Sequence, residues 1–255
     1  MDIMEAMRLR HSVRQYLDKP IEEEKLRRLR QEIDACSREG DLHIQLVCEE
    51  PRAFGGMIAR YGRFSGVHNY IALAGRREQG LSERAGYYGE RLVLLAQSLG
   101  LNTCWVALTF SKGKCAAQLE RGERLVCVIA LGYGTNQGVA HKNRPLEKLY
   151  RVDRPMPTWF LNGLNAALLA PTAINQQKFR FTLAGDTVKA QSTGGFFSKV
   201  DLGIVRYHFE LGAGTENFTW ADGFLAPAVQ EEAPPRESPA EEPQGEEQEQ
   251  EEKEA

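Results

Sequence analysis

Two apolar stretches in the middle of this 255-residue chain constrain its fold more than any other feature. Leu92–Leu99 ends a helix-like segment and is apolar on nearly all sides, which is typical of a helix buried at the centre of a protein. Leu125–Leu131 is an unbroken apolar run that ends at Gly132-Tyr133-Gly134, and such a run is typical of a fully buried strand. Together they predict an α+β fold with a substantial core.

The remaining elements are predicted from hydrophobic spacing. Apolar residues at helical spacing indicate helices, and alternating or β-branched runs indicate strands. We expect helices at 3–9, 21–36, 82–100, 155–169 and 201–211, and strands at 42–48, 67–74, 101–110, 125–131, 178–184 and 187–192. Gly185-Asp186 separates the last two strands and predicts a hairpin.

The order of these elements repeats along the chain. A proline-led helix, a strand and a later buried helix occupy residues 20–100, and the same order returns in residues 155–212. We therefore expect two pseudo-symmetric halves around a mixed β-sheet, with residues 1–150 as the first half and residues 151–228 as the second.

Charge sets the end of the chain apart. Residues 231–255 carry eleven Glu against Arg236 and Lys253, a net charge of −9, whereas the whole chain carries −3. Such a segment cannot bury enough apolar surface to offset its chain entropy, so residues 229–255 are predicted to be a disordered acidic tail. It is either a solubilising tail or an arm that engages a partner. The modest positive charge of the rest suits a phosphorylated ligand, and we expect no nucleic acid partner.

Composition also bears on the compartment. No run approaches the length of apolar chain needed to span a bilayer, and the charged amino terminus lacks the order of a secretory signal, so we expect no membrane association. The five cysteines are odd in number and form no Cys-x-x-Cys pair, which argues against disulfides and against a metal site. The chain is therefore expected to be cytoplasmic.

A cluster of anion-binding side chains follows the first predicted helix, at Arg10-His11-Ser12-Val13-Arg14. Guanidinium groups bind phosphate in a planar and often bidentate manner, and a short hydroxyl can add a further bond. Taken alone, the cluster is either a phosphate-binding segment or the solvated end of a basic helix.

A second polar constellation lies at Ala170-Pro171-Thr172-Ala173-Ile174-Asn175-Gln176-Gln177. Here a proline stops a helix, and a hydroxyl and several amides then line a turn before the next strand. Uncharged donors and acceptors of this kind can fix a heteroaromatic ring and a sugar chain. They are also common as capping and turn residues, so the turn by itself does not decide between the two interpretations.

Taken together, the two constellations resemble the nitroreductase family of flavin enzymes. Members show an Arg-x-Ser-x-Arg or Lys segment near the amino terminus and an Ala-Pro-Ser-x-x-Asn-x-Gln-Pro-Trp turn. Further matches are Glu90–Trp105, the strand that closes at Leu131-Gly132-Tyr133, and the basic segment Lys142-Asn143-Arg144-Pro145-Leu146. The resemblance covers roughly residues 1–225 and implies a nitroreductase-like fold with FMN as cofactor.

The resemblance also implies roles for individual residues. Arg10, His11 and Ser12 would hold the FMN phosphate and ribityl chain, Arg14 would lie near the N1/O2 edge of the ring, and Lys142 and Arg144 would complete the phosphate clamp. Pro171, Thr172, Asn175 and Gln177 would meet the ring and the ribityl chain from the other half. Backbone groups of Ala107 and Leu108 would reach the pyrimidine and N5 side.

Two departures from the family pattern are informative. In most members the Ala-Pro-Ser turn follows the first amphipathic helix, where this chain has Ala35-Cys36-Ser37-Arg38-Glu39, and the turn appears only in the second half. Gln177-Lys178-Phe179 also replaces Gln-Pro-Trp. This pattern resembles a single-chain branch of the family, a fused pseudo-dimer that keeps one of two sites, so we expect a monomer or a loose homodimer.

The implied function is FMN-dependent reduction of a small acceptor by ping-pong hydride transfer. NAD(P)H would reduce the flavin, and a nitroaromatic, a quinone or a related small molecule would then take the electrons. Because the chemistry takes place at flavin N5, no catalytic side chain is required. The alternative is a flavin-binding sensor or carrier protein without turnover.

Two titratable residues keep more than one interpretation. Glu90, in an apolar helix, either faces the pocket or pairs with Arg91 or another base. His208 is either a catalytic acid or a core histidine held by a backbone carbonyl. Trp105 is expected to belong to the core.

Overall fold

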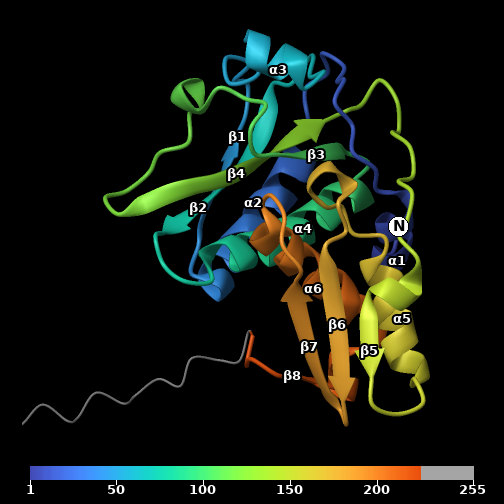
Figure 1. Cartoon of the computed structure of the whole chain (residues 1–255). Helices are drawn as coiled ribbons and strands as arrows, with labels where there is room; N and C mark the ends of the chain where they lie inside the picture. The colour runs from blue at the N-terminus through green and yellow to red at the C-terminus, as the bar shows by residue number, and fades with distance from the viewer. Residues whose placement is uncertain (225–255) are drawn as a thin grey trace, which may run out of the picture. The chain divides into compact units, whose positions relative to one another are not determined.

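The computed structural model describes residues 1–224, and residues 1–223 form one compact unit. Figure 1 shows this unit as two sheets with helices between and beside them. The predicted acidic tail at 229–255 lies outside the described residues. The α+β class predicted from the sequence is confirmed, although the strands form two separate sheets rather than one.

The first sheet has the strand order β1-β2-β4-β3, and every pairing in it is antiparallel. Its strands are β1 (His43–Val47), β2 (Asn69–Arg76), β3 (Asn102–Val106) and β4 (Glu123–Gly132). The run Leu125–Leu131, predicted as a buried strand, lies in central β4, where residues 126–132 are buried. Ile129 of β4 pairs with Ile71 of β2 on one side and with Trp105 of β3 on the other. Strand β3, which carries Trp105, is therefore an edge strand of this sheet.

The second sheet has the order β5-β6-β7-β8 and mixes parallel with antiparallel pairings. Its strands are β5 (Tyr150–Val152), β6 (Phe179–Ala184), β7 (Thr187–Ser192) and β8 (Thr219–Trp220). The hairpin predicted around Gly185 is confirmed, and that glycine has a φ of +57°. The short strands β5 and β8 were not predicted. The boundary expected between residues 150 and 151 falls within β5, and the division into halves stays a prediction.

Six α-helices accompany the sheets within residues 1–224. They are α1 (Ile3–Leu9), α2 (Glu23–Gly40), α3 (Met57–Tyr61), α4 (Leu81–Ser98), α5 (Thr158–Ala167) and α6 (Ser198–Ala213). Single 3₁₀ turns occur at η1 (Lys112–Lys114), η2 (Leu146–Lys148), η3 (Ala173–Asn175) and η4 (Thr215–Asn217). The five helices predicted from spacing are confirmed, and α3 is additional.

Helices α4 and α6 pack against each other (Figure 1). They approach most closely at Gly86 of α4 and Gly203 of α6. A Cβ atom at Gly203 would lie 1.9 Å from the carbonyl oxygen of Glu83, and one at Gly86 would lie 2.1 Å from that of Val200. Both distances are below van der Waals contact, so the backbones approach as closely as they do because neither residue has a side chain. Leu92–Leu94 of α4 are fully buried, as predicted for this helix.

Three further features of residues 1–224 concern membrane-spanning helices, metal-binding groups and the state of the cysteines. Within residues 1–224, no helix combines the length and the apolar character that crossing a membrane requires. The same residues contain no group of His, Cys, Asp and Glu side chains arranged to hold a metal ion. All five cysteines are free thiols.

Candidate functional site

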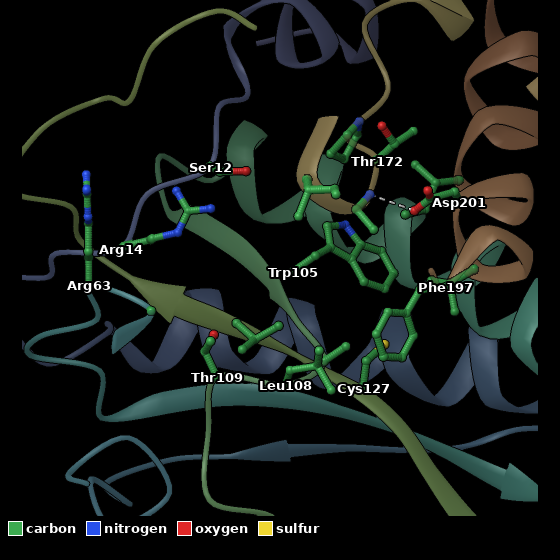
Figure 2. Close-up of a pocket in the computed structure, with 18 of the residues that line it drawn as sticks. Ser12, Arg14, Arg63, Trp105, Leu108, Thr109, Cys127, Thr172, Phe197 and Asp201 are labelled. Carbon is green, nitrogen blue, oxygen red and sulfur yellow. Dashed lines mark hydrogen bonds between the residues drawn. The ribbon is translucent and has the colours of Figure 1, made fainter. Parts of the chain in front are cut away.

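A cavity of about 510 Å³ collects residues from separate parts of the chain. Its lining comes from the segment after α1, the loop between α3 and β2, the end of β3 with the following loop, Cys127 of β4, the turn after α5 and the first turns of α6 (Figure 2). Six of the site residues predicted from the sequence are in this lining: Ser12, Arg14, Ala107, Leu108, Pro171 and Thr172. The structure thus brings the amino-terminal cluster and the turn of the second half to the same cavity.

The segment after α1 is held against the edge of the first sheet. Ser12 pairs with Thr103 of β3, and the backbone N–H of Val13 donates to the carbonyl of Thr103 at 3.0 Å. In an extended segment, alternate side chains point to opposite sides. Val13 is buried in the core, and Ser12 and Arg14 line the cavity.

Two arginines lie on one side of this cavity (Figure 2). The guanidinium of Arg14 lies 5.9 Å from the ring centroid of Phe64, and Arg63 belongs to the loop that carries this ring. Arg63 has a φ of +61°, an uncommon conformation for a residue with a side chain. Among the ion pairs of residues 1–224, neither guanidinium has a carboxylate partner. Two unpaired cations on one wall make the site suitable for an anionic ligand.

The turn after α5 is strained and is held by one buried side chain. Ile174, Asn175 and Gln177 all have positive φ angles, which non-glycine residues adopt only where their surroundings stabilise them. The amide of Gln177 donates to the carbonyl of Lys142 at 2.7 Å and accepts from the backbone N–H of Arg144 at 2.8 Å. Asn175 donates to the same carbonyl of Lys142 at 2.9 Å. Four predicted site residues therefore form a hydrogen-bonded cluster beside the cavity, although they are not in its lining.

Asp201, in the first turn of α6, connects this turn to the loop before the helix. One carboxylate oxygen accepts from the backbone N–H of Ala173 at 2.9 Å, and the other accepts from the side chain of Gln176 at 2.7 Å. The same Gln176 amide donates to the carbonyl of Phe196 at 2.7 Å. Asp201 is 7% exposed, and burial raises its pKa to about 6, although both hydrogen bonds act in the opposite direction.

Trp105 lines the cavity with one side and faces a buried polar cluster with its indole N–H. This N–H donates to Oε2 of Glu90 at 2.8 Å, and the other oxygen of Glu90 lies 2.9 Å from Nε2 of His208. Nδ1 of His208 lies 3.0 Å from the carbonyl of Ala166, and because a carbonyl only accepts, this nitrogen carries a proton. The interpretation of His208 as a core histidine held by a backbone carbonyl is confirmed. Glu90 pairs with bases of the interior, and Trp105 reaches the cavity rather than lying only in the core.

Arg10 belongs to this cluster rather than to the cavity lining. Its side chain is 4% exposed, Nε lies 3.8 Å from Glu90, and Nη2 donates to the carbonyl of Leu169 at 3.5 Å. The alternative interpretation of Arg10 as a solvated helix end was wrong, because the chain turns inward after α1. His11 also lies outside the lining, with Nδ1 3.3 Å from the carbonyl of Gln137.

Several lining residues were missed from the sequence. They include Tyr61, Arg63, Thr109, Phe197 and Asp201. A carboxylate between the apolar neighbours Val200 and Leu202 was a usable signal for Asp201, the same signal that drew attention to Glu90. Nothing local marks the others, because they reach the cavity through loop conformation.

Proteins similar to this chain are found among solved structures. A search of curated proteins finds no match. The crystal structure of a "putative nitroreductase" from Thermotoga maritima aligns with a TM-score of 0.59 and 22% identity over 83% of each chain. A "putative nitroreductase" in complex with FMN from Desulfovibrio desulfuricans aligns with a TM-score of 0.48 and 20% identity, over 62% of this chain and 99% of that one. An FMN-dependent nitroreductase from Clostridium difficile gives 0.44 and 16%, over 55% and 91%.

The family comparison covers most of the chain. The family model described as "Putative TM nitroreductase" matches residues 2–213, which span α1 to the end of α6 and include every segment that lines the cavity. The Thermotoga maritima structure supports the same fold over a similar share of the chain. The chain belongs to this nitroreductase family.

Proposed function

We propose that this protein is an FMN-dependent oxidoreductase that takes electrons from NADH or NADPH and passes them to a small acceptor, such as a nitroaromatic compound or a quinone. The observation that supports the proposal most strongly is the joint lining of one cavity by Ser12 and Arg14 with Pro171 and Thr172. Membership of a nitroreductase family supports the reaction type.

The cavity fits a flavin mononucleotide in size, charge and wall chemistry. A volume of about 510 Å³ is within the range of small-molecule sites, which is about 300–1,000 Å³. Trp105, Leu108 and Ile204 supply apolar wall for a flat ring. Arg14 and Arg63 supply positive charge that no carboxylate of the described residues neutralises.

Eight of the predicted residues would contact the ligand directly. We propose that Ser12, His11, Lys142 and Arg144 hold the phosphate and ribityl chain. Pro171, Thr172 and backbone groups of Ala107 and Leu108 would contact the ring.

Three further predicted residues would act through their neighbours. Asn175 and Gln177 would position the basic segment through the carbonyl of Lys142, since their side chains are already bonded there. Arg10 would support the wall of the site, because its side chain is buried beside Glu90, which accepts a hydrogen bond from the indole of Trp105.

Bound FMN would supply the redox chemistry by accepting two electrons from the nicotinamide and releasing them to the acceptor in alternating half-reactions. The side chains of this chain would contribute electrostatics and shape. A fixed cation such as Arg14 stabilises negative charge that develops near it, which favours a reduced and anionic ligand in the cavity.

The visible absorption spectrum of the purified protein tests the proposal directly. We expect a yellow protein whose flavin bleaches within seconds when NADH or NADPH is added without oxygen. Flavin that only dithionite reduces would overturn the enzyme proposal and favour the sensor or carrier alternative. A protein that neither carries nor binds FMN would overturn both.

We further propose that one chain is sufficient for the site, because the residues of both constellations come from the same chain. The protein would act in the cytoplasm as a monomeric pseudo-dimer or as a loose homodimer whose flavin site does not depend on association. FMN binding that disappears at concentrations where the chain is monomeric would contradict this proposal.

A further inference from the structure

We propose that Asp201 donates a proton to the electron acceptor during its reduction. This inference rests on the function proposed above and adds a chemical role that the family's flavin chemistry does not require of any side chain. It is carried by the position of Asp201 in the cavity wall, by its burial and by the lack of an ion-pair partner for it among residues 1–224.

The position of Asp201 is suited to acting on a ligand. Its carboxylate lies in the cavity wall on the side away from Arg14 and Arg63 (Figure 2). Hydrogen bonds from Ala173 and Gln176 fix both carboxylate oxygens. The group is therefore held at the cavity rather than free to turn into solvent.

Among the described residues that line the cavity, Asp201 is the only carboxylic acid. The other titratable lining residues are Arg14, Tyr61, Arg63 and Cys127. Burial raises the pKa of the Cys127 thiol to about 12, whereas that of Asp201 is raised to about 6. An acid with a pKa near the working pH is suited to proton transfer.

The charged groups on the surrounding elements do not neutralise Asp201. On α4, Glu83 pairs with Arg206 and also lies within the field of Lys199. On β4, Cys127 is the titratable neighbour, and the turn after α5 contributes only amide donors. In the ion pairs of residues 1–224, Asp201 has no cationic partner. Desolvation is therefore the main influence on its proton, and it favours the neutral acid.

The overall reaction requires such a proton. NAD(P)H, a quinone and one proton give NAD(P)⁺ and the hydroquinone. NAD(P)H supplies both electrons and one of the two protons that the quinone takes up. The second proton would come from the carboxyl group of Asp201, whose O–H bond breaks as an O–H bond forms at the acceptor oxygen. Solvent then returns a proton to the carboxylate.

A comparison of two acceptors separates proton donation from a structural role. Reduction of 1,4-benzoquinone consumes a proton, whereas ferricyanide takes up one electron and none. We expect Asp201→Asn, in the FMN-loaded protein, to slow the quinone half-reaction by about 10²-fold and to leave the ferricyanide half-reaction unchanged. Asp34→Asn, on the exposed face of α2, is the matched control and should alter neither rate. Equal slowing with both acceptors, or no slowing with either, would overturn the proposal.

A measurement on the unmodified protein keeps the proposal testable if the variant folds poorly. The quinone half-reaction of the wild-type protein should slow as the pH rises above about 6, while the ferricyanide half-reaction should not. In the cofactor-free protein, the ¹³C carboxyl signal of Asp201 should titrate with a midpoint near 6. A quinone rate that does not depend on pH between 5 and 8 would overturn the proposal. If NAD(P)H fails to bleach the flavin of the wild-type protein, the proposed function fails instead, so the two failures are distinguishable.

Discussion

The indole N–H of Trp105 donates a 2.8 Å hydrogen bond to the fully buried carboxylate of Glu90. Trp105 lines the cavity, whereas Glu90 lies behind it together with Arg10 and His208. The wall of the candidate site is therefore anchored in a buried charged cluster rather than in apolar packing alone. Because the cluster fixes the indole, substitutions in the cluster should alter the position of Trp105 in the cavity wall.

Removal of the Glu90 carboxylate should destabilise the protein strongly. Glu90→Ala would leave the Arg10 guanidinium buried without its anion and would remove the hydrogen bonds that Glu90 makes with His208 and Trp105, a loss that typically costs about 3–5 kcal/mol. Urea unfolding followed by far-UV circular dichroism measures the change. Glu147→Ala, an exposed position, is the control and should have no measurable effect. Equal stability of the two variants would contradict the role of the cluster.

The crossing of α4 and α6 should not tolerate a methyl group at Gly203. The added Cβ atom would lie 1.9 Å from the carbonyl oxygen of Glu83, so Gly203→Ala must push the two helices apart. Overpacking of this kind costs about 1–3 kcal/mol and sometimes more. Thermal unfolding should show a clearly lower midpoint for this variant. Gly113→Ala, where the added atom meets nothing within 4 Å, should leave the midpoint unchanged, and similar midpoints for both variants would show that the helices do not cross here.

Loss of the Gln177 side chain should loosen the turn that lines the cavity. Gln177→Ala would remove two hydrogen bonds of a buried side chain, one to the carbonyl of Lys142 and one from the backbone N–H of Arg144, at about 0.5–1.5 kcal/mol each. We expect lower stability together with weaker FMN binding, measured by urea unfolding and by flavin fluorescence titration. Gln79→Ala, at an exposed site, should change neither quantity. Normal FMN affinity in a destabilised Gln177→Ala protein would show that Gln177 contributes to stability and not to FMN binding.

Arg14→Ala should weaken FMN binding without unfolding the protein. The guanidinium is exposed and has no carboxylate partner among residues 1–224, so its removal leaves no buried charge behind. A hydrogen bond to a charged group contributes about 1.5–3 kcal/mol, which corresponds to roughly a 10- to 100-fold increase in Kd. Fluorescence titration of the cofactor-free protein measures this. Arg8→Ala, an exposed position in α1, should bind FMN normally, and equal Kd values for the two variants would refute the role of Arg14.

The pKa of Asp201 predicts a pH dependence of stability. Burial raises this pKa from 3.8 to about 6, so between these values the folded protein keeps a proton that the unfolded chain has lost. Folding is then favoured at low pH, and the contribution of Asp201 to stability falls as the pH rises from about 4 to about 6, by about 3 kcal/mol in total. Unfolding free energies of the wild type and Asp201→Asn, measured across this range, should diverge in favour of the variant. A difference that stays constant with pH would show that the carboxyl group titrates normally.

The sequence by itself determined the elements whose identity depends on neighbouring residues. The apolar run Leu125–Leu131 predicted a buried strand, and Leu92–Leu99 predicted a buried helix. Neither segment has a polar side that could face solvent. The hairpin around Gly185 was predicted from turn chemistry for the same local reason. The motifs that carry the family resemblance could also be recognised from the sequence alone, because each lies within a few consecutive residues.

Only the tertiary structure decided which of these pieces meet. The short strands β5 and β8 exist because β6 and β7 offer them partners, and no local pattern in two or three residues can specify a partner. Arg63 and Asp201 reach the cavity through a loop conformation and a helix crossing, and Arg10 turns into the core toward Glu90. Periodicity and turn chemistry act over a few residues, whereas burial, desolvation and charge pairing depend on groups that the folded chain brings together from far along the sequence.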